Sequence, residues 1–173
     1  MTKKSPYLLE RKAGLYLKHT TALKGRGVFC TRAIKAGEEL EATPALPLTE
    51  AETENAEKTI LRDYVFTIGK ITKKLQQKLK IKDTEAASCV IMGVATFCNH
   101  DEQPNAEIVW EERNGTLYHV LTATKSIPKN TEICTSYGEG WFNDRPELNW
   151  PGSKNKKKPQ LQLVQGGLNK KAA

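Results

Sequence analysis

The chain has 173 residues, a length typical of one domain, with 38% hydrophobic residues and a formal net charge of +7. Six lysines and no acidic residue lie in residues 151–173, which argues against a surface that is basic throughout. The longest uncharged segment, residues 86–100, is too short and polar to span a bilayer. Residues 1–5 are basic, but no apolar segment of a signal peptide follows them. We therefore expect a soluble, intracellular protein.

Short strands separated by turns are predicted along the first half of the chain. The strand signals are an apolar alternation at residues 15–17, a Gly-x-Gly loop leading into a strand at residues 23–29, a turn and strand start at residues 34–40, and an alternation at residues 63–68. An acidic helix is predicted over residues 49–60. Residues 69–83 are rich in lysine, with apolar residues at a four-residue spacing, which predicts an amphipathic helix or a hairpin arm.

A hairpin is the clearest local prediction in the second half. Strands over residues 106–110 and 117–123 flank Asn114-Gly115, a pair favoured where both turn residues need positive φ. A turn at residues 127–131 then precedes a strand over residues 132–136. We expect a mostly β fold with short helices in residues 1–150, followed by a basic, disordered tail in residues 151–173.

Two further features bear on chemistry. The four cysteines are scattered without a paired spacing, so we expect free, buried thiols, with neither a zinc site nor disulfides. Residues 101–150 hold four basic and nine acidic side chains, a net charge of −5. This acidic stretch is either an ordinary solvated surface or a face that attracts a cationic partner such as a lysine-rich peptide.

Five short motifs follow one another in a fixed order. Each alone is compatible with an ordinary turn or with packing, but their succession resembles the SET-domain family of protein-lysine methyltransferases, closest to its minimal viral and bacterial members. The resemblance covers residues 14–146. Its first three motifs are Gly25-Arg26-Gly27-Val28-Phe29, then Ala33 with Gly37-Glu38-Glu39-Leu40, then Asp63-Tyr64-Val65-Phe66. The other two are Phe97-Cys98-Asn99-His100 with Pro104-Asn105-Ala106, and Ile127-Pro128 with Glu132-Ile133 and Ser136-Tyr137-Gly138.

The resemblance implies a SET fold, made of small, curved, β-clip-like sheets with a C-terminal pseudo-knot. In it, the C-terminal strand would cross the Asn-His segment, a rare kind of threading. That crossing would bring Asn99, His100 and Tyr137 together.

The resemblance also implies methyl transfer from S-adenosyl-L-methionine to the ε-amine of a protein lysine. Arg26 and Gly27 would present backbone groups to the cofactor, glycine allowing its close approach, and Asn99 and His100 would bind its methionine and adenine portions. The expected catalytic residues are Tyr137, beside the methyl, and Tyr64, in the lysine channel. The channel would be closed, and the adenine covered, by Trp141 and Phe142. Residues 139–173 contain no cysteine, so no zinc is expected.

Substrate and partners stay open at this point. A histone tail is the first candidate, and a non-histone basic protein is the alternative. A non-catalytic SET-like module that binds protein or nucleic acid is the competing function. The lysine-rich tail at residues 154–159 is compatible with nuclear import, with weak nucleic-acid contact or with solubility alone. The lysine-rich residues 69–83 are compatible with a weak nucleic-acid contact or with a solvated surface. We expect the protein to lie in the nucleus, of its own cell or of a host cell, or in the cytoplasm, without membrane contact. We expect it to be a monomer or a homodimer.

Overall fold

The computed structural model describes residues 14–21, 24–68, 73, 77, 88–138, 140–143 and 145. The chain divides into two compact units, Met1–Ser136 and Tyr137–Ala173, and each is described here by itself. The lysine-rich segment at residues 69–83, apart from Lys73 and Gln77, and the tail at residues 151–173 lie outside the described residues. The predictions for both segments, and the domain boundary at residue 150, therefore stay predictions.

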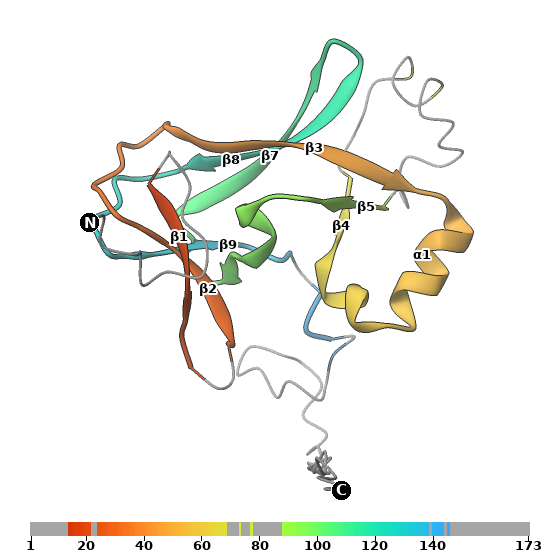
Figure 1. Cartoon of the computed structure of the whole chain (residues 1–173), viewed down its shortest axis with the longest axis horizontal. Coiled ribbons are helices and arrows are strands. Elements are labelled where there is room, and N and C mark those ends of the chain that lie inside the picture. Colours follow the sequence, from red (N-terminus) through yellow and green to blue (C-terminus); the bar gives the residue numbers. More distant parts are fainter. Residues whose placement is uncertain are drawn as a thin grey trace, which may run out of the picture. The chain divides into compact units, whose positions relative to one another are not determined.

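A four-stranded sheet in the first unit joins residues from both ends of that unit. Its strand order is β1 (Leu15–His19), β2 (Arg26–Cys30), β9 (Glu132–Thr135) and β6 (Asn99–His100). The pairs β1–β2 and β2–β9 are antiparallel, whereas β6 pairs with β9 in parallel. Figure 1 shows β9 beside the β1–β2 hairpin. The parallel pair places β9 beside the Asn-His segment.

A second sheet, of five antiparallel strands, also lies in the first unit. Its strand order is β4 (Val65–Thr67), β5 (Ser88–Ile91), β3 (Glu39–Leu48), β8 (Thr116–Ala123) and β7 (Ala106–Arg113). The β7–β8 hairpin, drawn in teal, extends past β3 in Figure 1. It turns at Asn114 and Gly115, with φ values of 51° and 72°, which confirms the hairpin that the Asn-Gly pair predicts.

Short helical segments link the strands, among them α1 (Glu50–Glu57) and the 3-10 turns η1 (Ile60–Tyr64) and η2 (Val94–Phe97). Thr49 and Glu52 begin α1 with a capping box, as each side chain accepts a bond from the other residue's backbone N–H. The alternation at residues 63–68 is only partly a strand, because Asp63 and Tyr64 still belong to η1. The Thr59 hydroxyl accepts from Leu61 N at 3.1 Å and so starts this extra turn.

The hydrophobic core takes side chains from both sheets and from the connections between them. Its fully buried members include Leu15, Val28, Ile91, Leu121, Ile127 and Ile133. All four cysteines are free and buried, as the sequence predicts. Burial raises the pKa of Cys89 to about 12 and that of Cys134 to about 11, so both stay as thiols at neutral pH. The mostly β fold with short helices is confirmed. Within the described residues, no helix has the length and apolar character to traverse a bilayer.

Candidate active site

Three strands bring two of the sequence motifs together at one place, here called the β2–β6–β9 junction. Strand β9 lies between the other two, with Ile133 opposite Val28 and Cys134 opposite Asn99. The Asn99 amide nitrogen donates to the Arg26 backbone oxygen at 3.1 Å, although 73 residues separate the two. The Gly-x-Gly loop and the Asn-His motif therefore form one site.

The turn η2 sets where Asn99 enters the junction. The Glu41 carboxylate, from β3, accepts from the backbone N–H of Ala95 at 2.8 Å, near the start of η2. A Cβ on Gly93 would overlap the side chains of Glu41 and Thr43, so glycine is needed there for this carboxylate to reach the turn. The second sheet thereby fixes the short segment that leads through Phe97 and Cys98 to Asn99.

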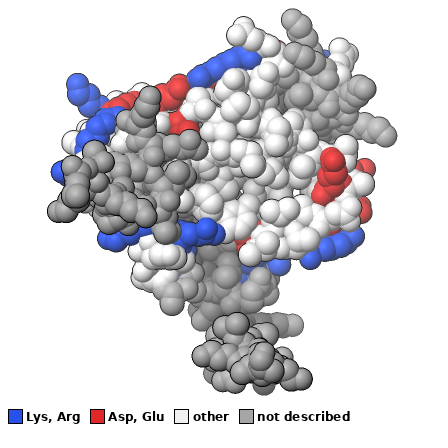
Figure 2. All heavy atoms as spheres, in the orientation of Figure 1, with Lys and Arg blue, Asp and Glu red and all other residues white. Residues whose placement is uncertain are grey.

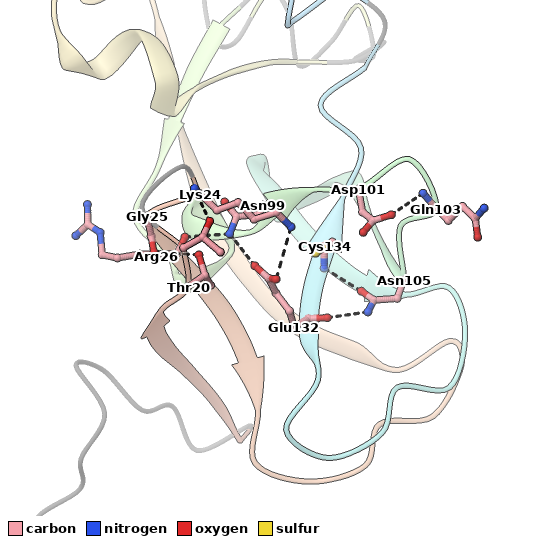
Figure 3. Close-up of polar contacts among 11 residues, drawn as sticks. Thr20, Lys24, Gly25, Arg26, Asn99, Asp101, Gln103, Asn105, Glu132 and Cys134 are labelled. Carbon is pink, nitrogen blue, oxygen red and sulfur yellow. Dashed lines mark hydrogen bonds and ion pairs between the residues drawn. The ribbon is translucent and has the colours of Figure 1, made fainter. Parts of the chain in front are cut away.

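Glu132 is a further residue of the junction, beyond the site residues that the sequence predicts. Its Oε1 accepts from the Asn99 amide nitrogen at 2.7 Å, and its Oε2 lies 3.8 Å from Lys24 Nζ. Figure 3 shows the carboxylate between the Asn99 and Lys24 side chains. A signal was present, because Glu132 is the acidic residue of the motif that ends in Tyr137 and Gly138.

The Asn105 side chain anchors strand β9 from the other side (Figure 3). Its amide nitrogen donates to the Glu132 backbone oxygen at 2.8 Å, and its amide oxygen accepts from Cys134 N at 2.9 Å. Both bonds go to backbone groups of β9, so Asn105 fixes the strand that carries Glu132. The short loop before it is held by Asp101, whose carboxylate accepts from Gln103 N at 2.8 Å.

Gly27 is buried at the junction, and the space beside its Cα is filled by protein. A Cβ there would overlap Glu132 Oε1 and lie 2.9 Å from Asn99 Nδ2. The structure thus gives a reason for glycine within the chain itself, separate from the expected close approach of a cofactor.

The side chain of Arg26 points away from the junction and joins two aromatic residues. Its guanidinium lies 4.8 Å from the centre of the Phe97 ring and donates to the Tyr64 hydroxyl at 3.4 Å. Tyr64 and Phe97 meet edge to face, with ring centres 5.9 Å apart. Tyr64, expected in the lysine channel, therefore lies beside Arg26 and beside Phe97, which comes two residues before Asn99 in the sequence.

His100 is buried in β6, with its backbone beside Thr135 of β9. Its Nε2 lies 3.5 Å from a carboxylate oxygen of Glu102. The backbone N–H of the next residue, Asp101, donates to the Thr135 oxygen at 3.1 Å, which extends the β6–β9 pairing. Asn99 and His100 are thus both held rigidly at the edge of the sheet.

The second unit contains a compact aromatic group. The ring centres of Tyr137 and Trp141 are 4.6 Å apart, those of Trp141 and Phe142 4.8 Å, and those of Tyr137 and Phe142 6.1 Å. The guanidinium of the buried Arg145 lies 4.0 Å from the Trp141 ring centre and donates to the Trp141 backbone oxygen at 3.1 Å. Gly138 and Gly140, with φ values of 87° and 95°, provide the turns that gather the rings.

The sequence-predicted site residues therefore fall into two groups. Arg26, Gly27, Asn99 and His100 lie in or beside the β2–β6–β9 junction, with Tyr64 attached through the Arg26 side chain. The aromatic residues Tyr137, Trp141 and Phe142 form the second group, in the other unit. The expectation that Tyr137 lies near Asn99 and His100 stays a prediction.

The acidic stretch at residues 101–150 is partly neutralised within the described part of the chain. Glu111 and Glu39 both pair with Arg113 at 2.8 Å, and Glu132 pairs with Lys24. On the face shown in Figure 2, acidic and basic side chains lie mainly around the edges of a largely uncharged surface. Among the described residues, no three His, Cys, Asp or Glu side chains are grouped to hold a metal ion.

Comparisons with known proteins agree with this architecture. The SET domain family model matches residues 25–138. A histone-lysine N-methyltransferase of Schizosaccharomyces pombe, specific for H3 lysine-37, is 29% identical over 126 residues, which are 72% of this chain and 74% of that protein. The Neurospora SET domain protein DIM-5, a histone lysine methyltransferase, has a similar structure, with a TM-score of 0.57, 23% identity, and coverage of 75% of this chain and 54% of that one. A Polycomb Repressive Complex 2 structure from Chaetomium thermophilum gives a TM-score of 0.56 at 18% identity, covering 72% of this chain and 15% of that one.

Proposed function

The chain belongs to the SET domain family, and from this premise we propose that it is an S-adenosylmethionine-dependent protein-lysine N-methyltransferase. The observation that carries the proposal is the β2–β6–β9 junction. It joins the Gly-x-Gly loop to the Asn-His motif by a hydrogen bond across 73 residues, inside the region that the family model matches. The likeness to a histone-lysine methyltransferase supports the same activity.

The polar groups of the junction fit this cofactor, which carries a sulfonium and an ammonium group. The Glu132 carboxylate puts negative charge beside β2 and β6, with one fifth of its side chain exposed. Arg26, Gly27, Asn99 and His100 would hold the cofactor through backbone groups and the Asn99 amide. When bound, the cofactor supplies an activated methyl group that a neutral amine can take directly.

The residues of this chain would then contribute orientation and exclusion of water. In-line transfer needs the amine, the methyl and the sulfur in a row, and such positioning can lower the barrier by several kcal/mol. The hydroxyl of Tyr137 would accept a weak C–H···O contact from the methyl. Tyr64, held by Arg26 and Phe97, would line the channel for the lysine. Trp141 and Phe142 would close it.

The substrate lysine must lose its proton before it can react. Its ordinary pKa is about 10.4, and both desolvation and a nearby positive charge lower the pKa of an amine. An aromatic channel next to a sulfonium provides both effects. The grouped rings of Tyr137, Trp141 and Phe142 are suited to form such a wall.

For the substrate we propose a histone tail, since the S. pombe relative is named for lysine-37 of histone H3. A non-histone basic protein is the alternative that the assay below separates. We also propose that residues 1–150 form the SET domain and that the lysine-rich tail at residues 151–173 supports nuclear import. Deletion of residues 151–173 should then abolish nuclear accumulation, and unchanged localisation would contradict the import role.

The direct test follows labelled methyl from S-adenosylmethionine onto core histones and onto a whole-cell lysate. Tyr137→Phe serves as the matched variant, because it removes one hydroxyl and keeps the ring. Label on a histone that disappears with Tyr137→Phe would support the proposal. Label on a different protein would identify that protein, and not a histone, as the substrate. Binding of the cofactor without any methyl transfer would favour a non-catalytic binding module.

A further inference from the structure

The Asn99 side chain has its orientation decided by its neighbours. Its amide nitrogen faces two acceptors, the Arg26 backbone oxygen at 3.1 Å and Glu132 Oε1 at 2.7 Å (Figure 3). A carbonyl and a carboxylate can only accept, so the –NH₂ group must point toward them. An amide carries two N–H hydrogens, and these two bonds use both. The amide oxygen is then the polar atom of the Asn99 side chain that remains for a ligand.

Of the two partners, Glu132 makes the stronger bond. A hydrogen bond to a carboxylate is shorter and about twice as strong as one between neutral groups. The Arg26 oxygen is part of the backbone and is present whatever the side chain, whereas the Glu132 carboxylate is specific to this residue. The Asn99 oxygen is therefore directed mainly by Glu132.

Two other features of the chain help to keep the Glu132 carboxylate and the Asn99 amide in contact. Asn105 holds the β9 backbone at Glu132 through a 2.8 Å bond to the Glu132 oxygen. Gly27 has no Cβ at the point where one would overlap Glu132 Oε1 and crowd Asn99 Nδ2. Asn105 and the side-chain-free Gly27 therefore both preserve the contact between the Glu132 carboxylate and the Asn99 amide.

We propose that Glu132 is a positioning residue that holds the Asn99 amide with its oxygen turned to the ligand, so that the site takes a hydrogen-bond donor there, a cationic amine best of all. The identity of the ligand rests on the proposed function, in which the hydrogen-bond donor is the α-amino group of the cofactor. An Asn99 amide turned the other way would offer N–H groups and would disfavour an ammonium group.

Four variants separate this role from a general loss of structure. Glu132→Ala removes the acceptor, and Glu132→Gln keeps an acceptor oxygen without the charge and is the variant to use where Glu132→Ala fails to fold. Lys24→Met is the matched control, because Lys24 contacts the other carboxylate oxygen of Glu132. Asn99→Ala removes the amide itself, alone and combined with Glu132→Ala.

The first readout needs no cofactor. Nuclear magnetic resonance follows hydrogen exchange of the Asn99 side-chain –NH₂ in the free protein, which both hydrogen bonds should slow. We expect exchange to be at least about tenfold faster in Glu132→Ala, in line with the loss of one bond to a charged group, intermediate in Glu132→Gln, and unchanged in Lys24→Met. Equal exchange in wild type and in both Glu132 variants would overturn the positioning role.

The second readout is calorimetric affinity for S-adenosylmethionine and for an analogue that lacks the α-amino group. We expect the wild type to prefer the amine-bearing ligand by about 10- to 100-fold. That preference should approach one in Asn99→Ala and decrease in Glu132→Ala, where the Arg26 backbone oxygen still accepts from the amide. It should persist in Lys24→Met, and the double variant should behave like Asn99→Ala. Equal weakening of both ligands by Glu132→Ala, with the preference intact, would overturn the inference. A wild type that binds neither ligand would instead contradict the proposed function, while the exchange readout still decides the role of Glu132.

Discussion

The amide nitrogen of Asn99 lies 2.7 Å from a carboxylate oxygen of Glu132, so strands β6 and β9 are joined by a charge-assisted bond as well as by their parallel pairing. The bond stands directly over Gly27 of β2. Three strands that are far apart in the sequence thus meet around one polar contact. Substitutions on or beside these strands can test what the contact does.

Gly27→Ala should weaken cofactor binding more than it weakens the fold. The added Cβ would displace the Glu132 carboxylate and crowd the Asn99 amide, but a carboxylate at the end of a side chain can move at little cost. We expect the free energy of unfolding to change by about 1 kcal/mol or less and the affinity for S-adenosylmethionine to fall about tenfold or more, measured by denaturant unfolding and calorimetry.

Gly37→Ala is the matched control for that change. Gly37 lies outside the junction, in the turn before β3, with a φ of 78°, and a Cβ there would meet nothing within 4 Å. The variant should lose about 1–2 kcal/mol of stability through backbone strain and keep its cofactor affinity. Loss of affinity in Gly37→Ala but not in Gly27→Ala would contradict the role given to the junction.

Asn105→Ala should destabilise the chain by about 1–3 kcal/mol, because it leaves the Glu132 carbonyl and the Cys134 N–H without their side-chain partner. Asn105→Asp should cost at least as much, since it sets a second acceptor against the Glu132 carbonyl. Urea unfolding measures both. Asn55→Ala, at an exposed position of α1, should change stability by less than about 0.5 kcal/mol, and an equally small effect at Asn105 would show that β9 does not depend on this anchor.

Local features of the fold could be predicted from the sequence, and long-range ones could not. The β7–β8 hairpin follows from Asn114-Gly115, because the turn residues themselves decide its geometry. The strand β5 (Ser88–Ile91) and the turn η2 carry no such local signal, since they are short and lie in an uncharged segment without alternation.

The candidate site shows the same division. The motifs that contain Arg26 and Asn99 are visible in the sequence. Their contact, however, depends on the parallel pairing of β6 with β9, and the hydrophobic pattern of the sequence does not indicate which strands pair. The role of Glu132 cannot be recognised in the sequence for a related reason. A glutamate at the start of a strand is commonly a solvated residue, and only the fold places its carboxylate against Asn99.

His119 should make the fold sensitive to mild acid. The ring is fully buried in β8, between Phe66 and Trp110, and within the described part of the chain neither ring nitrogen has a hydrogen-bond partner. Burial lowers the pKa of His119 from 6.5 to about 4, so the folded state keeps the ring neutral while the unfolded chain protonates it below pH 6.5. Stability is then fully present above pH 6.5 and is lost as the pH falls from 6.5 toward 4.

Between pH 7.5 and pH 5, this residue should account for a loss of about 2 kcal/mol in the free energy of unfolding. His119→Phe keeps an aromatic ring between Phe66 and Trp110 and removes the titrating group. The free energy of unfolding of this variant should therefore fall by about 2 kcal/mol less than that of the wild type over the same pH range. Urea unfolding at both pH values measures the difference. Identical losses in wild type and His119→Phe would mean that other groups cause the acid sensitivity.

Methyl transfer should accelerate from pH 7 toward pH 9, because a growing fraction of the substrate lysine is neutral. Well below the lysine pKa, the gain should approach about tenfold per pH unit. The folded chain keeps His119 neutral throughout this range, because the pKa of the buried ring is lowered to about 4. Initial rates at saturating cofactor measure the profile, and a flat one would mean that a step other than chemistry, such as product release, limits turnover.

The measurement that most directly tests the central claim is a titration of isotopically labelled protein with S-adenosylmethionine, followed by nuclear magnetic resonance. If the β2–β6–β9 junction holds the cofactor, the backbone signals of Arg26, Gly27, Asn99 and His100 should shift together and saturate at one affinity, while those of the Asn114–Gly115 turn stay in place. Saturable shifts elsewhere, with these four signals unmoved, would contradict the account.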